Sequence, residues 1–82
     1  MPTVCGIDVS DGSATVNGFG EDVSCRRIGD KVRTEVLNGT AEGYNKSGGK
    51  DSITSGEDEY AICEASRNGV RCWKARAAAF MS

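Results

Sequence analysis

Apolar and polar residues alternate at the start of the chain in the pattern typical of paired β-strands. The alternation covers residues 5–9 and resumes over residues 13–17. Between these segments lies Asp11-Gly12, a dipeptide that favours the tight type I′ turn of a β-hairpin. This turn would bring the apolar side chains of both segments to one face: Cys5, Ile7, Val9, Ala14 and Val16. The pattern therefore predicts a first hairpin with its turn at Asp11-Gly12.

A second hairpin is predicted near the end of the chain. Residues 60–67 and 70–75 flank Asn68-Gly69, which is also a strong turn dipeptide. A turn at Asn68-Gly69 would place Cys63 opposite Lys74.

The predicted register of this second hairpin bears on the disulfide bonds. With Cys72 opposite Ala65, the cysteines Cys63 and Cys72 become diagonal neighbours, about 7 to 8 Å apart. That spacing is poor geometry for a direct bond. We therefore expect Cys5 and Cys25 each to bond to one of these two cysteines, which would join the ends of the chain.

The segment between the two hairpins gives weaker patterns. Residues 20–29 carry acids first, bases last and Gly29 at the end. This charge order favours one short helix over residues 21–28. A strand is the competing interpretation, and it would place three residues on one face: Val23, Cys25 and Arg27.

The following residues predict a strand and then a long connection. Residues 31–37 alternate as a strand that ends at Asn38-Gly39. The stretch 43–59 is rich in Gly, Ser, Lys and Asp, with Ile53 as its one aliphatic side chain. This composition predicts a mobile connection.

The aliphatic composition favours a mostly β fold. Bulky aliphatic residues are chiefly Val and Ile, with a single Leu, and β-branched residues fit strands better than helices. The 82 residues suffice for one small domain, 1–82. We predict an α+β, mostly β fold, with a small antiparallel sheet arranged as a single layer or a sandwich. A chain of this size buries only about 60% of its unfolded surface, so we expect disulfide bonds to brace it.

Four cysteines without any histidine favour disulfide bonds over a zinc site. Cys5, Cys25, Cys63 and Cys72 include no short C-x₂₋₄-C turn of the kind that aims two ligands at one ion. We therefore expect two disulfide bonds, no metal and no cofactor. Persistent disulfides form in oxidising compartments, so the chain is expected to be secreted. Two acceptor patterns for N-glycosylation occur, at Asn38 and Asn45.

The residue types disfavour catalysis. Without histidine, neither a Ser-His-Asp nor a Cys-His arrangement is available. The acidic run 57–59 lies among Gly and Ser and is typical of a solvated loop rather than a catalytic carboxylate pair. We expect a protein that is not an enzyme.

Basic and aromatic residues near the second hairpin suggest a contact surface. The net charge of −2 disfavours nucleic acid as a partner, although basic residues surround Trp73. The predicted binding surface draws on six residues: Trp73, Arg71, Lys74, Arg67, Tyr60 and Tyr44.

In size, glycine content and cysteine number, the chain resembles the small secreted cysteine-bridged proteins of fungi and yeasts, which include virulence effectors and killer toxins. The resemblance implies an effector or killer-type toxin, or a toxin subunit, that binds a protein, cell-wall or membrane component of another cell. A secreted carbohydrate-binding module or hydrolase inhibitor is the alternative. A subunit of a processed precursor is a third option, in which a second subunit would cover apolar residues such as Phe19 and Phe80.

Overall fold

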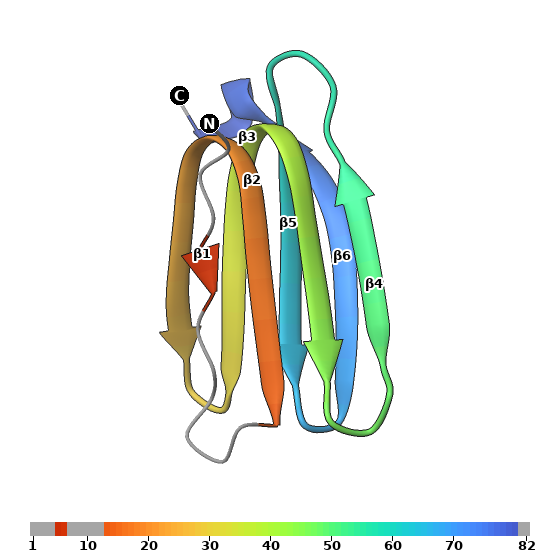
Figure 1. Cartoon of the computed structure of the whole chain (residues 1–82). Coiled ribbons are helices and arrows are strands. Elements are labelled where there is room, and N and C mark those ends of the chain that lie inside the picture. Colours follow the sequence, from red (N-terminus) through yellow and green to blue (C-terminus); the bar gives the residue numbers. More distant parts are fainter. Residues whose placement is uncertain (1–4, 7–12, 81–82) are drawn as a thin grey trace.

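One long hairpin bends over on itself and contributes to both layers of the fold. The computed structural model describes residues 5–6 and 13–80. The hairpin consists of β2 (Ala14–Ile28) and β3 (Lys31–Asn45), which are antiparallel. Figure 1 shows both strands arching over one end of the molecule. The pairing register shifts near the middle of β2, and each strand has one half in each layer.

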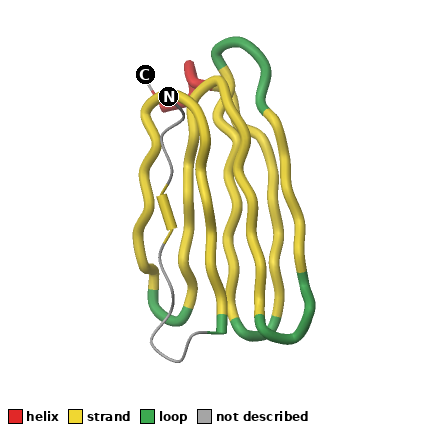
Figure 2. Tube along the Cα trace, in the orientation of Figure 1, coloured by secondary structure: helices red, strands yellow, loops and turns green. Residues whose placement is uncertain are grey.

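Within the described residues, four shorter strands widen the two layers. In the first layer, β1 (Cys5–Gly6) pairs with the first half of β2, and β4 (Lys50–Thr54) pairs with the second half of β3. In the second layer, β5 (Glu59–Ser66) pairs with the first half of β3, and β6 (Gly69–Arg76) pairs with β5. A 3₁₀ turn, η1 (Ala77–Phe80), follows β6. Figure 2 shows that strands make up most of the described chain.

The core lies between the two layers and consists of small side chains. A Cβ built on Gly18 of the first layer would meet Thr34 and Val36 of the second layer at 2.6 and 2.7 Å. Small side chains allow the layers to approach closely, and the molecule measures 35 × 28 × 17 Å. Among the described residues, the buried core cluster contains eight: Ala14, Val16, Val32, Val36, Ala41, Ala61, Cys63 and Ala65.

Two glycines allow the long hairpin to bend. Gly20 has a φ of +149°, and a Cβ on it would lie 2.9 Å from the Cα of Gly39. A Cβ on Gly39 would collide with the carbonyl oxygen of Phe19. Ser55 holds Gly39 from the other side: its hydroxyl accepts a hydrogen bond from the Gly39 N–H (2.8 Å), and its N–H donates to the Gly39 carbonyl (2.7 Å). The bend therefore needs glycine at both positions.

The predicted mostly β, antiparallel and disulfide-bonded architecture is confirmed. The structure pairs Cys5 with Gly18 and Gly6 with Asn17. This is the register that a turn at Asp11-Gly12 predicts, although that turn lies outside the described residues.

The short helix predicted over residues 21–28 is wrong, because these residues form the second half of β2. Cys25 pairs with Thr34, and the side chains of Val23 and Cys25 pack against the core, as the strand interpretation required. Gly29 has a φ of +62°, but it begins the turn between β2 and β3 instead of ending a helix. Hydrogen bonds and packing between strands thus outweigh the local charge order.

The predicted long connection over residues 43–59 needs correction, because it contains β4 and the ends of two neighbouring strands. Asn45 closes the turn before β4: its side-chain oxygen accepts a hydrogen bond from the Gly49 N–H (2.7 Å), and its Nδ2 donates to the Ser66 carbonyl (3.1 Å). Ile53 packs against the core. Pairing with β3 therefore organises a segment that has little apolar content of its own.

The predicted turn at Asn68-Gly69 is also wrong by one residue. The turn lies at Arg67-Asn68, and Gly69 is already in β6, opposite Ser66. The Ser66 hydroxyl accepts a hydrogen bond from the Asn68 N–H (3.2 Å) and supports the turn from within. The shift changes every cross-strand neighbour but leaves each side chain on its predicted face.

The register shift also overturns the predicted cysteine pairing. Cys63 and Cys72 lie directly opposite each other, with their Cα atoms 4.1 Å apart, and form a disulfide bond. Cys25 is disulfide-bonded as well. The side chain of Cys5 lies outside the described residues.

Tryptic mapping without reduction tests the cysteine pairing. Cleavage after Lys and Arg separates fragment 51–67, which contains Cys63, from fragment 72–74, which contains Cys72. We expect these two fragments to remain linked, while fragment 1–26 is joined to neither. A link between fragment 1–26 and either hairpin fragment would restore the pairing expected from the sequence and refute the one in the structure.

A glycine-to-alanine pair tests the bend. Gly39→Ala is expected to lower the free energy of unfolding by about 2 kcal/mol or more, because the new methyl group collides with backbone. Gly69→Ala is the matched control, since nothing lies within 4 Å of its Cβ position, and it should change stability by less than about 0.5 kcal/mol. Urea denaturation measures both values, and equal values for the two variants would contradict the role given to Gly39.

Candidate functional site

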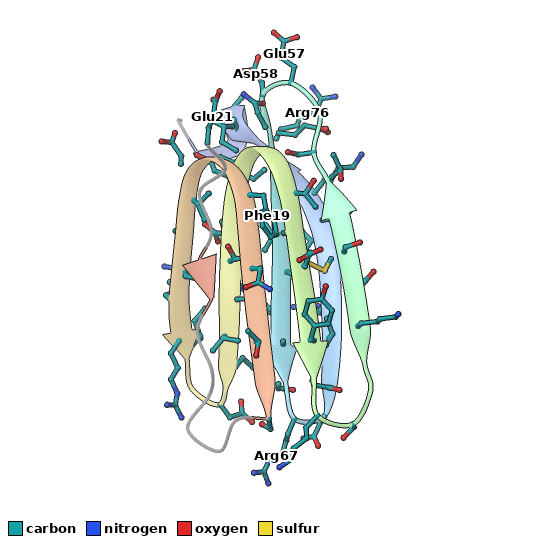
Figure 3. All side chains as sticks on the ribbon, in the orientation of Figure 1. Phe19, Glu21, Glu57, Asp58, Arg67 and Arg76 are labelled. Carbon is teal, nitrogen blue, oxygen red and sulfur yellow. A yellow bond between two sulfur atoms is a disulfide. The ribbon has the colours of Figure 1, made fainter. Side chains whose placement is uncertain are left out.

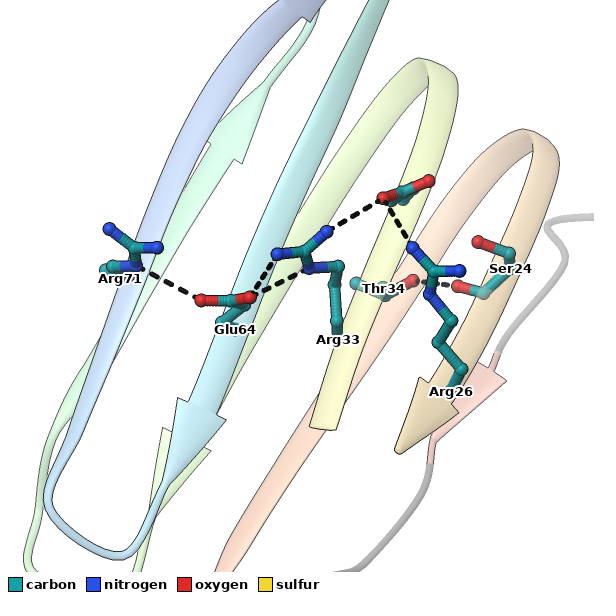
Figure 4. Close-up of polar contacts among 7 residues, drawn as sticks. Ser24, Arg26, Arg33, Thr34, Glu64 and Arg71 are labelled. Atoms are coloured by element: carbon teal, nitrogen blue, oxygen red, sulfur yellow. Dashed lines mark hydrogen bonds and ion pairs between the residues drawn. The ribbon is translucent and has the colours of Figure 1, made fainter. Parts of the chain in front are cut away.

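Alternating charges cross the outer face of the second layer. Five residues form this ladder over β2, β3, β5 and β6, in the order Arg26, Glu35, Arg33, Glu64 and Arg71. Figure 4 shows Arg26, Arg33, Glu64 and Arg71 along this line. The ion-pair distances are 3.6 Å for Arg26–Glu35, 3.4 Å for Arg33–Glu35 and 3.1 Å for Arg71–Glu64. Arg33 binds Glu64 with two nitrogens, one of them Nε at 2.9 Å. The ladder holds three cations and two anions and has an arginine at each end.

Glu64 is the most deeply buried member of the ladder. Its side chain is only 7% exposed, whereas that of Arg71 is 71% exposed. Burial by itself raises the pKa of Glu64, but hydrogen bonds from Arg33 and Arg71 outweigh this effect and hold the pKa below its ordinary value of 4.5. The same hydrogen bond to Glu64 raises the pKa of Arg33. The arginines therefore keep a charged carboxylate in a mostly covered position.

The indole ring of Trp73 lies beside the ladder. Trp73 stands opposite Ile62, which is 2% exposed, and the indole itself is half-buried. The guanidinium carbon of Arg71 lies 4.7 Å from the ring centroid, and that of Arg33 lies 5.4 Å from it. These are cation–π distances, so both arginines are oriented by the ring as well as by Glu64.

An open hollow lies at the Arg71 end of the ladder. Its volume is about 420 Å³, and its walls come from the β2–β3 turn on one side and from the β5–β6 hairpin on the other. The residues that supply polar groups to it are Asp30, Lys31, Glu64, Ser66, Asn68 and Arg71. Gly69 lines the hollow without a side chain, which leaves the space open.

The structure brings three of the six predicted site residues to this outer face and separates the others. Trp73, Arg71 and half-buried Tyr60 share the face. Lys74 points to the opposite face of β6, across from Ala61. Arg67 is exposed in the hairpin turn, and Figure 3 places it at the opposite end of the molecule from Glu57 and Asp58.

Tyr44 lies in the first layer, apart from Trp73. It pairs with Thr15 and Lys50 and is 41% exposed. A smaller hollow of about 330 Å³ adjoins it. Phe19 is half-buried on β2 of the same layer, and the side chain of Phe80 lies outside the described residues.

The residues that organise the Trp73 surface carry no distinctive signal in the sequence. Arg33, Glu35 and Glu64 occupy alternate strand positions and were indistinguishable from an ordinary solvated face. Only the register of three neighbouring strands places Arg33 and Arg71 on either side of Glu64. Opposite charges at cross-strand positions are a usable signal once the register is known.

The described residues contain no group of three or more His, Cys, Asp or Glu side chains placed to hold a metal ion. In the same part of the chain, no helix is long and apolar enough to cross a membrane. Comparisons of the chain with protein-family models, curated proteins and solved structures found no match.

Acidification tests the role of Glu64. Because its pKa is lower in the folded protein, Glu64 stabilises the fold fully above its unfolded pKa, and this contribution is lost as the pH falls through the folded pKa. Glu64→Gln should lower the free energy of unfolding at pH 7 by about 2–3 kcal/mol, since it weakens the charge-assisted hydrogen bonds of Arg33. It should also flatten the loss of stability below pH 4.5.

Thermal or urea unfolding between about pH 3 and pH 7 measures this dependence, over the range in which carboxyl groups titrate. Glu57→Gln removes an exposed loop carboxylate and serves as the control for the loss of one negative charge. If both variants lose stability with falling pH as the unsubstituted protein does, Glu64 is not responsible for that loss.

Proposed function

We propose that this protein is a secreted, disulfide-stabilised binding protein, and that its contact surface consists of Trp73, Arg71 and the adjoining hollow. Within that class, we propose an effector or killer-type toxin that binds a component of a foreign cell. The observation that carries the proposal is the arrangement at Trp73: an indole ring is held by two guanidinium groups, and one of them, Arg71, lines an open hollow.

Binding surfaces concentrate their free energy in residues of this kind. Trp and Arg are enriched among the residues that dominate interfaces, because each buries a large area and also offers polar contacts. Here Glu64 and the indole ring already restrict the Arg71 side chain. Binding of a partner would therefore cost less side-chain entropy, because the surface is already partly ordered.

The disulfide bonds support the proposed location. Cys63–Cys72 and the bond at Cys25 would persist in an oxidising compartment. A thin core of small side chains also benefits from covalent bracing outside the cell.

A carbohydrate-binding module is the second candidate, and the exposed ring of Tyr44 favours it. The neighbouring hollow is lined by polar side chains, among them Glu42, Lys50, Asp51 and Ser52. An exposed aromatic ring beside hydrogen-bonding groups suits a sugar ring, which offers an apolar face and a hydroxyl rim.

Binding of fluorescently labelled protein to intact cells and to isolated wall polysaccharides distinguishes the two candidates. The panel would contain fungal, bacterial and animal cells. Trp73→Ala is expected to weaken binding about 30-fold, the effect of losing a dominant interface residue. Tyr44→Ala is the matched aromatic control and should leave binding within about twofold, as for a residue outside the interface.

Circular dichroism of each variant, with the more conservative Trp73→Phe alongside, separates loss of binding from loss of folding. Weakening by Tyr44→Ala alone would replace the proposal with the carbohydrate-binding alternative. Absence of binding to every cell type and polysaccharide would refute a role in contact with foreign cells.

A further inference from the structure

We propose that the hollow beside Arg71 binds a carboxylate from an acidic peptide segment of a partner protein. This inference rests on the proposed contact surface and assigns it a ligand chemistry. It starts from the charge ladder, in which every carboxylate lies between two arginines, whereas the last arginine has a carboxylate on one side only.

Arg71 uses only part of its hydrogen-bonding capacity. Its Nε donates to Glu64 (3.1 Å), and neither terminal nitrogen has a partner among the described residues. The inner arginine, Arg33, instead donates from all three of its nitrogens to Glu35 and Glu64. The guanidinium of Arg71 is therefore fixed by Glu64 and Trp73, while its terminal N–H groups remain available for a carboxylate.

The hollow supplies a second cation at the right place. Lys31 lines it from the start of β3, opposite Arg71 on the β5–β6 hairpin. Of the two acids that line the hollow among the described residues, Glu64 is neutralised by Arg33 and Arg71, so Asp30 is the opposing charge there. A carboxylate held between Lys31 and Arg71 would continue the alternation of the ladder by one more member.

The arrangement of Trp73 favours a peptide over a sugar as the source of the carboxylate. Arg33 and Arg71 both lie over the indole ring, so the ring acts as a support for guanidinium groups. A sugar platform would need that ring face uncovered. An acidic side chain would bind the edge of the Arg71 guanidinium from within the hollow, and both the edge and the hollow are accessible.

Fluorescence titration tests this inference, since Trp73 is the single tryptophan and lies against Arg71. The probe is the blocked peptide acetyl-(Glu-Ser)₃-amide, and acetyl-(Gln-Ser)₃-amide serves as the uncharged probe. We expect the acidic peptide alone to change the Trp73 emission. Arg71→Gln should weaken its binding about tenfold or more, the effect of losing a charge-assisted pair.

Two further variants show whether the acidic peptide binds in the hollow or is attracted only by the positive charge of the surface. Arg26→Gln removes the same charge at the other end of the ladder, from a side chain that is 59% exposed and does not line the hollow. It should leave the Kd within about twofold, because exposed charges interact weakly. Gly69→Val keeps every charge and fills open space in the hollow, so it should abolish peptide binding. Equal weakening by Arg26→Gln and Arg71→Gln, or unchanged binding in Gly69→Val, would overturn the inference.

The cell-binding assay separates this inference from the proposed function. If the acidic peptide fails to bind while cell binding still depends on Trp73, the carboxylate site is refuted and the contact surface stands. If the peptide binds in the hollow while cell binding is indifferent to Trp73, the proposed function fails and the carboxylate site stands. Binding of polygalacturonate but not of the peptide, with loss in Arg71→Gln, would overturn the choice of a protein partner.

Discussion

The close approach of two backbones at Gly20 and Gly39 is the constraint on which the rest of the structure depends. Without that approach, β2 and β3 would form a flat ribbon with an exposed apolar face. The bend places the two halves of the ribbon face to face, and a core of small side chains is then enough to hold the layers together. It also leaves each layer with a separate outer face, on which polar chemistry can be arranged.

The outer face of the second layer combines stability with recognition. The central strand β5 is buried on both faces between Ala61 and Ser66, because Arg33, Arg71 and Trp73 cover its outer side chains. The arginines must keep their positions in order to cover Glu64. Because Arg71 is already held by its hydrogen bond to Glu64, it would lose little conformational entropy on binding an external anion. The residues that neutralise the buried carboxylate are thus also those proposed to contact a partner.

Much of the fold was predictable, while the site was predictable only in fragments. The turn dipeptide Asp11-Gly12 predicted the register of β1 with β2, and the Val and Ile content predicted the β class. Trp73 and Arg71 stood out as an aromatic and a cation in one strand. Glu64 and Arg33 did not stand out, because charged residues on the polar face of a strand have the same pattern whether they are solvated or paired.

The sequence by itself determined which residues could form strands and which side of each strand could be buried, because these properties depend on local alternation and side-chain shape. Only the tertiary structure decided the register of β5 with β6, and with it the Cys63–Cys72 bond. It likewise decided that residues 21–28 extend a strand and that a ladder of charges crosses four strands. These outcomes depend on contacts between segments far apart in the chain, whose energies no local pattern contains.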